Sequence, residues 1–286
     1  MRGAHPERHL EAEIEKTLAF RPAETVLVAC SGGPDSAALS ALAARASQHA
    51  GATVVLAHIN HGVRESAWQD EGVVLALGTT LAVRVLCASV DAAKSEERLR
   101  EARYRALAGL AARVGASRVC TAHHAEDQTE TILLALFRGT GHRGLMGMEP
   151  QRPLNQTVTL SRPLLRIGRE ALRRYCERER LPYVLDESNS DMAFRRNALR
   201  AALSSLRGPF PHLDEAVARC AEIVREEHED RPRAHVRREL REALKGSVGL
   251  RDVTFERLEA AARLVESQQG GRVFVRDGVE VTVRRG

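Results

Sequence analysis

Long apolar runs alternate with amphipathic segments in the first half of the chain. The apolar runs lie at residues 25–31, 52–60, 82–90 and 117–124, and 156–164 adds a shorter one. The segment 95–114 and the stretch after residue 125 carry apolar residues at helical spacing. Strands that are apolar on both faces, separated by helices, are typical of a parallel sheet covered on both sides. The sequence therefore predicts an α/β fold with a doubly wound, mostly parallel sheet of Rossmann-like type.

The pattern changes after about residue 165, where charged, amphipathic helices replace the apolar runs. The breaker cluster GPFP at 208–211 indicates a boundary. We therefore expect a catalytic domain at 1–207 and a small, basic, helix-rich domain at 208–286. Near the end, VFVRDGVEVTV predicts a hairpin that turns at Asp277-Gly278.

Composition narrows the class of protein. Of the 286 residues, 43% are hydrophobic, which is enough for a globular core. No apolar run approaches 18 residues, so no membrane span is expected. The charged first residues lack the apolar centre of a signal peptide, and we expect a cytosolic protein. The five cysteines form no CxxC pair, which argues against disulfides and against a cysteine metal site.

The excess positive charge lies entirely in the second part of the chain. Residues 1–160 hold 17 basic and 17 acidic residues, whereas 161–286 hold 26 and 21, which gives the net charge of +5. A neutral nucleotide-type half joined to a basic half fits an enzyme that acts on nucleic acid.

The stretch VLVACSGGPDS, residues 26–36, reads as a strand, a tight glycine loop and the start of a helix. Its glycines allow close approach to phosphate oxygens, its serines offer hydroxyl groups, and its proline suits an early helical position. The expected ATP-binding residues here are Ser31, Gly32, Gly33, Pro34, Asp35 and Ser36. The alternative is an ordinary strand-to-helix turn, with Asp35 capping the helix.

Two features of the glycine loop, the presence of Asp35 and the absence of a lysine, predict the type of reaction. A carboxylate beside phosphates needs an intervening cation, so Asp35 implies Mg²⁺ bound together with ATP. The loop lacks the lysine of GxxxxGK[ST], which serves transfer of the γ-phosphate. A cradle of amides and Mg²⁺ suits a leaving pyrophosphate better, which predicts adenylyl transfer that yields AMP and pyrophosphate.

SGGPDS resembles the SGGxDS loop of the N-type ATP pyrophosphatases, or PP-loop proteins. Further motifs follow in order: HINHGVRESAWQDE (58–71), ERLREARYRAL (97–107), AHHAEDQTETILLALFRGTGHRGLMGM (122–148), RPLL (162–165) and DESNSDMAFRRNALR (186–200). Together they resemble the tRNA(Ile)-lysidine synthetases, in a short form. One departure is Glu126, where that family usually has aspartate; we expect the extra methylene to be tolerated.

The resemblance implies a ligase that modifies tRNA. ATP adenylates C2 of the wobble cytidine in a CAU-anticodon isoleucine tRNA, and the ε-amine of free lysine then displaces AMP. The implied cofactors are ATP and Mg²⁺, and the implied partners are this tRNA and L-lysine. A homodimer is compatible with the sequence.

Several residues outside the loop gain roles from the resemblance. Arg103 interrupts an apolar helical stripe and is expected at the adenylate, with His58 and His123, which end strands. Asp127 and Glu130 share a helix face and are expected to bind the lysine ammonium and act in catalysis. The expected tRNA contacts are Arg64, Arg195, Arg196, Asn197 and Arg200.

Each of these residues also has a purely structural interpretation. Arg103 could reach solvent at the helix edge, the acids could stabilise a helix N-terminus, and the arginines could form a solvated surface. Two other functions remain open as well. One is a tRNA thiolase of the same superfamily, which the absence of CxxC disfavours; the other is a non-catalytic adenine-nucleotide sensor.

Overall fold

The computed structural model describes residues 6–60, 67–90, 96–185, 195–229, 232–247, 253, 255–268, 270–276 and 278–283. These residues divide into two compact units. Unit 1 comprises residues up to 134 together with 147–218, and unit 2 comprises 135–146 and the residues from 219 onward. Each unit is described by itself. The boundary that the sequence predicts at residue 208 stays a prediction.

Unit 1 is built on a six-stranded sheet. In chain order the strands are β1 (Thr25–Ala29), β2 (Thr53–Asn60), β3 (Arg84–Ser89), β4 (Arg118–Cys120), β5 (Gln151–Pro153) and β6 (Thr159–Ser161). Their order across the sheet is β3-β2-β1-β4-β6-β5, and all neighbours are parallel except β5 and β6. This sheet confirms the predicted mostly parallel α/β fold.

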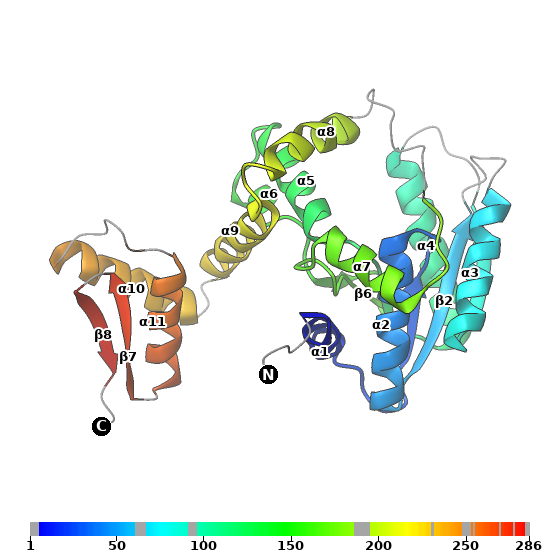
Figure 1. Ribbon diagram of the computed structural model, residues 1–286, viewed down its shortest axis with the longest axis horizontal. Helices are drawn as coiled ribbons and strands as arrows, with labels where there is room; N and C mark the ends of the chain where they lie inside the picture. The colour runs from blue at the N-terminus through cyan, green and yellow to red at the C-terminus, as the bar shows by residue number, and fades with distance from the viewer. Residues whose placement is uncertain are drawn as a thin grey trace. The chain divides into compact units, whose positions relative to one another are not determined.

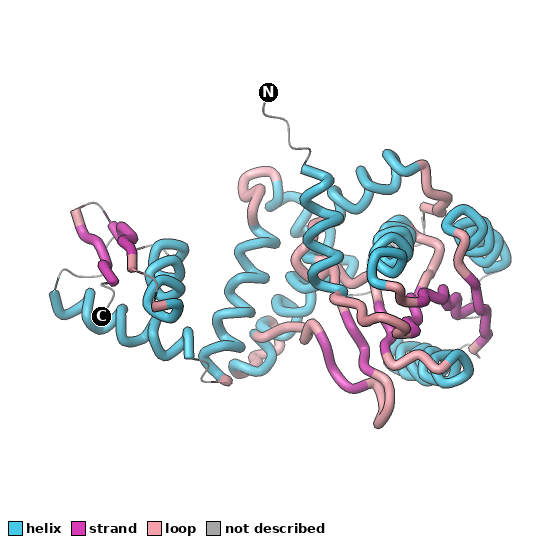
Figure 2. The backbone as a smooth tube through the Cα atoms, turned by 90° about the horizontal axis from the view of Figure 1, so that it is seen from below, coloured by secondary structure: helices cyan, strands magenta, loops and turns pink. Residues whose placement is uncertain are grey.

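Helices cover both faces of this sheet (Figures 1 and 2). The helices that lie wholly in unit 1 are α1 (Pro6–Leu18), α2 (Pro34–Ala50), α3 (Ala67–Leu81), α4 (Glu96–Val114), α7 (Arg169–Glu179) and α8 (Arg195–Arg207). Alternate residues of β1 point to opposite faces: Val26 and Val28 pack with α1, α2 and α7, whereas Leu27 packs with α4. β1, β2 and β4 each contribute residues to both cores in this way, as their uninterrupted apolar sequences require.

Two helices cross from one unit to the other. They are α5 (Ala125–Leu136) and α9 (Leu213–His228). Unit 2 also holds α6 (His142–Leu145), α10 (Pro232–Ser247), α11 (Phe255–Ser267), β7 (Gly271–Arg276) and β8 (Val279–Val283). In the described chain, no helix is long and apolar enough to span a membrane.

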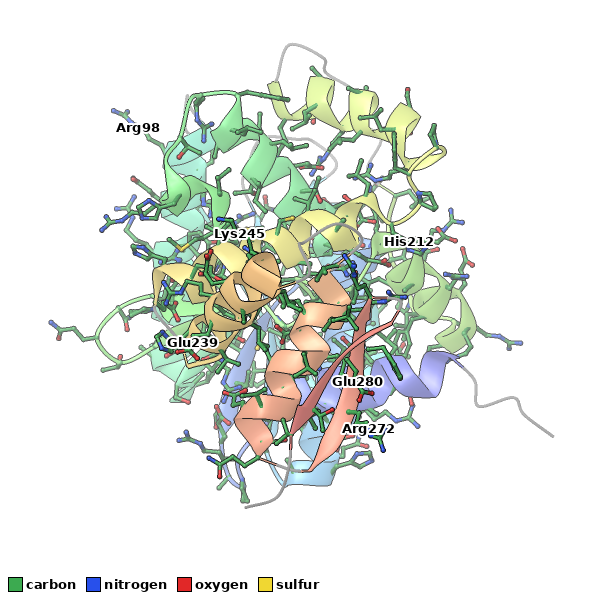
Figure 3. All side chains as sticks on the ribbon, turned by 90° about the vertical axis from the view of Figure 1, so that its left-hand side faces the viewer. Arg98, His212, Glu239, Lys245, Arg272 and Glu280 are labelled. Carbon is green, nitrogen blue, oxygen red and sulfur yellow. The ribbon has the colours of Figure 1, made fainter. Side chains whose placement is uncertain are left out.

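The predicted C-terminal hairpin is confirmed, because β7 and β8 pair antiparallel. Gly278 has φ +75°, as a tight turn requires, and Asp277 lies outside the described residues. A small core of Leu244, Leu258, Ala261 and Val275 joins the hairpin to α10 and α11. Charged side chains such as Lys245, Arg272 and Glu280 are exposed on this unit (Figure 3).

Candidate active site

The predicted site residues follow the carboxyl ends of neighbouring parallel strands. The glycine loop follows β1, His58 lies near the end of β2, and His123 and His124 come after β4. Because β1 pairs with both β2 and β4, these segments meet at one edge of the sheet. Ligands of open α/β sheets bind at this edge.

Gly32 has a backbone conformation that favours glycine, in contact with two other segments. Its φ is +91°, and an added Cβ would lie 3.4 Å from the backbone oxygen of Asp70 and 3.5 Å from a methyl group of Val184. The Gly32 carbonyl accepts a hydrogen bond of 2.9 Å from the Val184 N–H. The loop is therefore held between two other segments of the chain.

Ser36 and His58 fix the shape of the loop from beneath. The Ser36 hydroxyl accepts the Ser31 N–H at 3.2 Å and donates to the Gly33 carbonyl at 2.9 Å. The His58 ring nitrogen Nδ1 lies 3.0 Å from the carbonyl oxygen of Cys30. Ser36 and His58 are both buried, whereas Ser31 is exposed. In this conformation Ser36 and His58 shape the loop, and the exposed Ser31 hydroxyl lies 3.2 Å from that of Ser36.

The N-terminus of α2 has backbone N–H groups that are suited to an anion. The helix begins at Pro34, and the first turn of any helix leaves N–H groups without intrahelical acceptors. The proline lacks an N–H, so it loses nothing there. The Cys176 thiol of α7 donates to the Pro34 carbonyl at 3.2 Å, which ties α7 to this turn.

Asp35 has one oxygen that is buried without a partner. Its Oδ1 accepts no hydrogen bond from the described residues. Its Oδ2 lies 3.6 Å from Nε2 of His124 and 3.7 Å from Nε of the exposed Arg169. An unsatisfied buried carboxylate oxygen is costly, so this atom is suited to an additional ligand.

His124 links the loop to the predicted lysine acids, a role that sequence reasoning missed. Its Nδ1 lies 2.9 Å from Glu126, and its Nε2 lies 3.4 Å from Asp127 and 3.6 Å from Asp35. Burial lowers the pKa of His124, but the bonds to Asp35 and Glu126 and the charge of Asp127 outweigh it and raise the pKa to about 10. His124 is thus an imidazolium between three carboxylates. The only sequence signal was its place beside His123 at a strand end.

Glu126, the departure from the family pattern, has a structural role here. Both of its carboxylate oxygens accept the backbone N–H of Arg169, each at 3.0 Å. Arg169 is the first residue of α7, so Glu126 accepts one of the N–H groups that lack a partner within that helix. The side chain therefore spans the starts of α5 and α7, and also bonds His124.

His123 lies in a positive environment beside Arg103. Burial lowers the pKa of His123 to about 3; Asp127 opposes this, and the charges of Arg162, Arg103 and Arg100 add to it. Its Nδ1 is 2.9 Å from the Thr121 hydroxyl. His123 is therefore neutral at physiological pH, and the predicted residues Arg103 and His123 share one region of the site.

The lowered pKa of His123 makes the stability of the protein dependent on pH. The unfolded state binds a proton at His123 below about pH 6.5, but the native state does so only near pH 3. Native stability is therefore lost as pH falls from 6.5, by up to about 1.4 kcal/mol per unit. We expect the free energy of unfolding of His123→Asn, measured with urea, to fall less steeply between pH 6.5 and 4.5 than that of the unaltered protein. The exposed His212 (Figure 3) provides the control His212→Asn, and parallel curves for His123→Asn and the unaltered protein would contradict this account.

The acids predicted to bind lysine are paired with arginines predicted to bind tRNA. Glu130 is 2% exposed, and its two oxygens accept Nε of Arg196 at 2.9 Å and Nε of Arg200 at 2.6 Å. Nη2 of Arg200 also lies 3.4 Å from Oδ1 of Asp127. We call Asp127, Glu130, Arg196 and Arg200 the α5–α8 ion cluster. Here the two arginines are not a merely solvated surface.

The pKa shifts within the α5–α8 ion cluster follow its geometry. Burial lowers the pKa of Arg200, but the hydrogen bond and charge of Glu130 outweigh it, so the net pKa is raised. Burial raises the pKa of Asp127, but the charge of His124, the hydrogen bond from the His124 N–H and the charge of Arg196 bring the net pKa below its ordinary value. Asp127 is therefore ionised and weakly basic in this arrangement.

Some predicted tRNA-binding residues fall outside this geometry. Arg64 lies outside the described residues, and so does the side chain of Arg195, whose backbone begins α8. Asn197 lies on α8 and is half-buried.

A family model for the PP-loop domain matches residues 6–206. A tRNA(Ile)-lysidine synthase from Salinispora arenicola is 38% identical over 77% of this chain and 68% of its own length. The chain belongs to the tRNA(Ile)-lysidine synthase family of PP-loop proteins. Another lysidine synthase, from Ralstonia nicotianae, is 43% identical over 69% of this chain but only 44% of its own length. The chain thus spans less than half the length of the first lysidine synthases that it matches.

Among solved structures, the chain is similar to the U34-tRNA thiolase NcsA from Methanococcus maripaludis with its [4Fe-4S] cluster. The TM-score is 0.64 at 13% identity, over 75% of this chain and 77% of the thiolase. At that identity the likeness shows the fold alone. This chain and the thiolase therefore share a fold.

Proposed function

We propose that this chain forms lysidine in a CAU-anticodon isoleucine tRNA. The observation that carries the proposal is His124, which joins the Asp35 end of an ATP-binding loop to the Asp127 end of an acidic cluster. This arrangement supports a site for adenylation next to a site for an amine. The name of the lysidine synthase relatives supports the same reaction.

In the first step, the C2 oxygen of the wobble cytidine attacks the α-phosphorus of ATP, and pyrophosphate leaves. The N–H groups at the start of α2 and the exposed hydroxyl of Ser31 bind the phosphates. Arg103 and neutral His123, which lie near each other, would contact the adenylate as it forms. A neutral imidazole carries one N–H group, so it can donate one hydrogen bond to a phosphate oxygen without adding a positive charge.

The residues around Asp35 fit Mg²⁺ bound together with ATP. The unpartnered, buried Oδ1 of Asp35 is a hard oxygen ligand at the phosphate loop. In the part of the chain that the structure describes, no group of three or more metal-binding side chains could hold an ion alone. Asp35 would therefore share the ion with phosphate oxygens. When bound, Mg²⁺ would neutralise charge on the departing pyrophosphate.

In the second step, the ε-amine of lysine attacks C2, the bond between C2 and the adenylate oxygen breaks, and AMP leaves. Asp127 and Glu130 bind the incoming ammonium, which must also lose a proton before it attacks. Both acids are held by Arg196 and Arg200, so lysine competes with guanidinium groups for them. The charge of Arg196 helps to lower the pKa of Asp127, so displacement of Arg196 would make Asp127 a better base.

A thiolase reaction is less well supported by the cysteines. Burial raises the pKa of Cys120 to about 12, and burial together with the charge of Asp35 raises that of Cys176 to about 12. Thiolates are therefore scarce at these positions at neutral pH, and the thiolate is the nucleophilic form of cysteine.

One experiment separates lysidine formation from the alternatives. The protein is incubated with Mg-ATP, labelled lysine and CAU-anticodon isoleucine tRNA, and label in RNA is measured with pyrophosphate release. We expect both signals, and neither with a tRNA that carries a different anticodon. Labelling only from a sulfur donor would indicate a thiolase, and ATP binding without pyrophosphate release would indicate a nucleotide sensor. Either result would refute the proposed function.

A further inference from the structure

Four arginines gather around Tyr104 in unit 1. The guanidinium carbons of Arg100 and Arg103 on α4 lie 5.5 and 5.6 Å from the centre of the Tyr104 ring, and that of Arg152 on β5 lies 5.1 Å away. Arg162 follows β6 and influences the pKa of the Tyr104 hydroxyl. We call Arg100, Arg103, Arg152 and Arg162 the arginine cluster.

The arginine cluster has no acidic partner within the part of the chain that the structure describes. In the described parts of the chain, no carboxylate forms an ion pair with any of the four arginines. Arg162 is 3% exposed; its Nη1 donates to the Glu149 carbonyl at 2.6 Å, whereas its buried Nε has no hydrogen-bond partner among the described residues. Leaving a buried charged donor unsatisfied is costly, so a ligand at this position would be stabilising.

Another buried arginine of the same chain shows the contrast. Arg237 in unit 2 is 2% exposed, and it forms ion pairs with Glu226 and Glu259 at 2.6 and 2.9 Å and with Glu227 at 3.4 Å. That arrangement is the ordinary way to bury a guanidinium group. The absence of such partners at Arg162 in the described residues therefore points to an anion supplied from outside.

The ionisation of neighbouring groups supports a strongly positive potential. Burial raises the pKa of Tyr104, but the charges of Arg100, Arg162 and Arg103 outweigh it and lower the net pKa. Burial and the neighbouring Arg152 and Arg100 lower the pKa of Arg162, and Tyr104 opposes them. Arg162, Arg103 and Arg100 also act on His123, which connects the arginine cluster to the candidate active site.

We propose that Arg100, Arg152 and Arg162 of the arginine cluster bind a backbone phosphate of the RNA substrate, beside the adenylate contact proposed for Arg103. This inference rests on the proposed function for the nature of the substrate. Arg100 is exposed and Arg152 is half-buried, so the cluster opens to solvent and can receive a phosphate within a long chain. Guanidinium groups bind such phosphates bidentately and fix the register of the RNA. The phosphates of ATP have a different proposed site, at the glycine loop and the start of α2.

The test uses an Arg100→Ala/Arg152→Ala double variant of the full chain. These two side chains are not fully buried, whereas Arg162 is buried and its removal would disturb the fold more. Fluorescence anisotropy measures binding of a labelled CAU anticodon stem-loop at several salt concentrations, and ATP binding is titrated separately. We expect weaker RNA binding and a log–log salt slope reduced by about 0.7 to 0.9 for each phosphate that is no longer bound. The loss of RNA affinity should be the same for a stem-loop with another anticodon, since a phosphate carries no base identity.

The matched control is Arg105→Ala, an exposed arginine of α4 two residues beyond Arg103 and so on a different face of the helix. We expect its RNA affinity and salt slope to equal those of the unaltered protein. An unchanged salt slope in the double variant, or weakened ATP binding with unchanged RNA binding, would overturn the inference. If the unaltered protein binds RNA through this cluster but adds no lysine, the proposed function fails and the inference stands.

Discussion

Asp35→Asn is expected to abolish tRNA-dependent pyrophosphate release, with a rate loss of at least about 10³-fold. The side chain keeps its size but loses the charge that would hold Mg²⁺ against the phosphates of ATP. Charge stabilisation by a metal ion contributes several kcal/mol, and each 1.4 kcal/mol is a factor of ten in rate. Asp35→Ala should have the same effect. The measurement is pyrophosphate release with saturating tRNA at ordinary Mg²⁺ concentration.

The fold should survive this substitution, which makes the result interpretable. Weakening the interaction with His124 is unfavourable, but removing the negative charge from a side chain with a buried, unpartnered oxygen is favourable. We therefore expect the free energy of unfolding without ATP to change by less than about 2 kcal/mol. Glu170→Gln, at an exposed carboxylate in the first turn of α7, is the control. Full pyrophosphate release by Asp35→Asn would show that this carboxylate does not serve the phosphates.

Apolar runs made the centre of the fold predictable from the sequence. The strands at 25–31, 52–60 and 82–90 contain β1, β2 and β3, since a parallel strand buried on both faces has an unmistakable apolar pattern. The edge strand β5, with the sequence Gln-Arg-Pro, was missed. It is three residues long and carries no alternation, so its pairing with β6 comes from tertiary contacts.

The candidate site was predictable only in its parts. The glycine loop has a local signature, because tight turns and close backbone approach restrict the residues that fit. The position of His124 between Asp35 and Asp127 depends on the pairing of β1 with β4, which local sequence does not contain. The pairing of Glu130 with Arg200 joins positions 70 residues apart. The sequence predicts a lysine pocket and a separate RNA-binding surface. In the structure, the residues of these two predictions form one ion cluster.

Glu130→Gln is expected to separate the two chemical steps. Adenylation of tRNA should continue, because Glu130 contacts neither the glycine loop nor Asp35 in the described residues. Lysine transfer should be lost, with the KM for lysine raised about 10- to 100-fold, since hydrogen bonds to charged groups contribute roughly 1.5–3 kcal/mol. Asp127→Asn should behave in the same way. Pyrophosphate release and lysine incorporation are measured separately in each variant.

The length of the amine should matter in the unaltered protein. Glu130 is buried and fixed by two arginines, so its carboxylate defines the depth of the proposed pocket. Ornithine is one methylene shorter than lysine, and arginine carries a larger, planar cation. Both should be poor substrates when each replaces lysine in the incorporation assay. Efficient incorporation of ornithine would show that the pocket does not measure chain length.

The α5–α8 ion cluster requires a control, because Glu130 also anchors α8. Removal of Glu130 leaves Arg196 and Arg200 able to reach water, as their side chains are 28% and 34% exposed. Removal of Arg200 instead leaves the buried Glu130 paired with Arg196 alone among the described residues, which should lower stability more. Glu101→Gln, at an exposed acid of α4, provides a variant that should change neither step.

Arg200→Ala then distinguishes lysine binding from simple anchoring of α8. If Glu130 serves only to hold the helix, Arg200→Ala and Glu130→Gln should lower the melting temperature and both chemical steps together. If Glu130 binds lysine in competition with Arg200, Arg200→Ala should lower the KM for lysine, while Glu130→Gln raises it. The proposed lysine pocket predicts these opposite shifts because a lysine ammonium and the Arg200 guanidinium would occupy the same carboxylate. Parallel losses in adenylation and lysine transfer would instead assign the α5–α8 ion cluster to the structure of the helix.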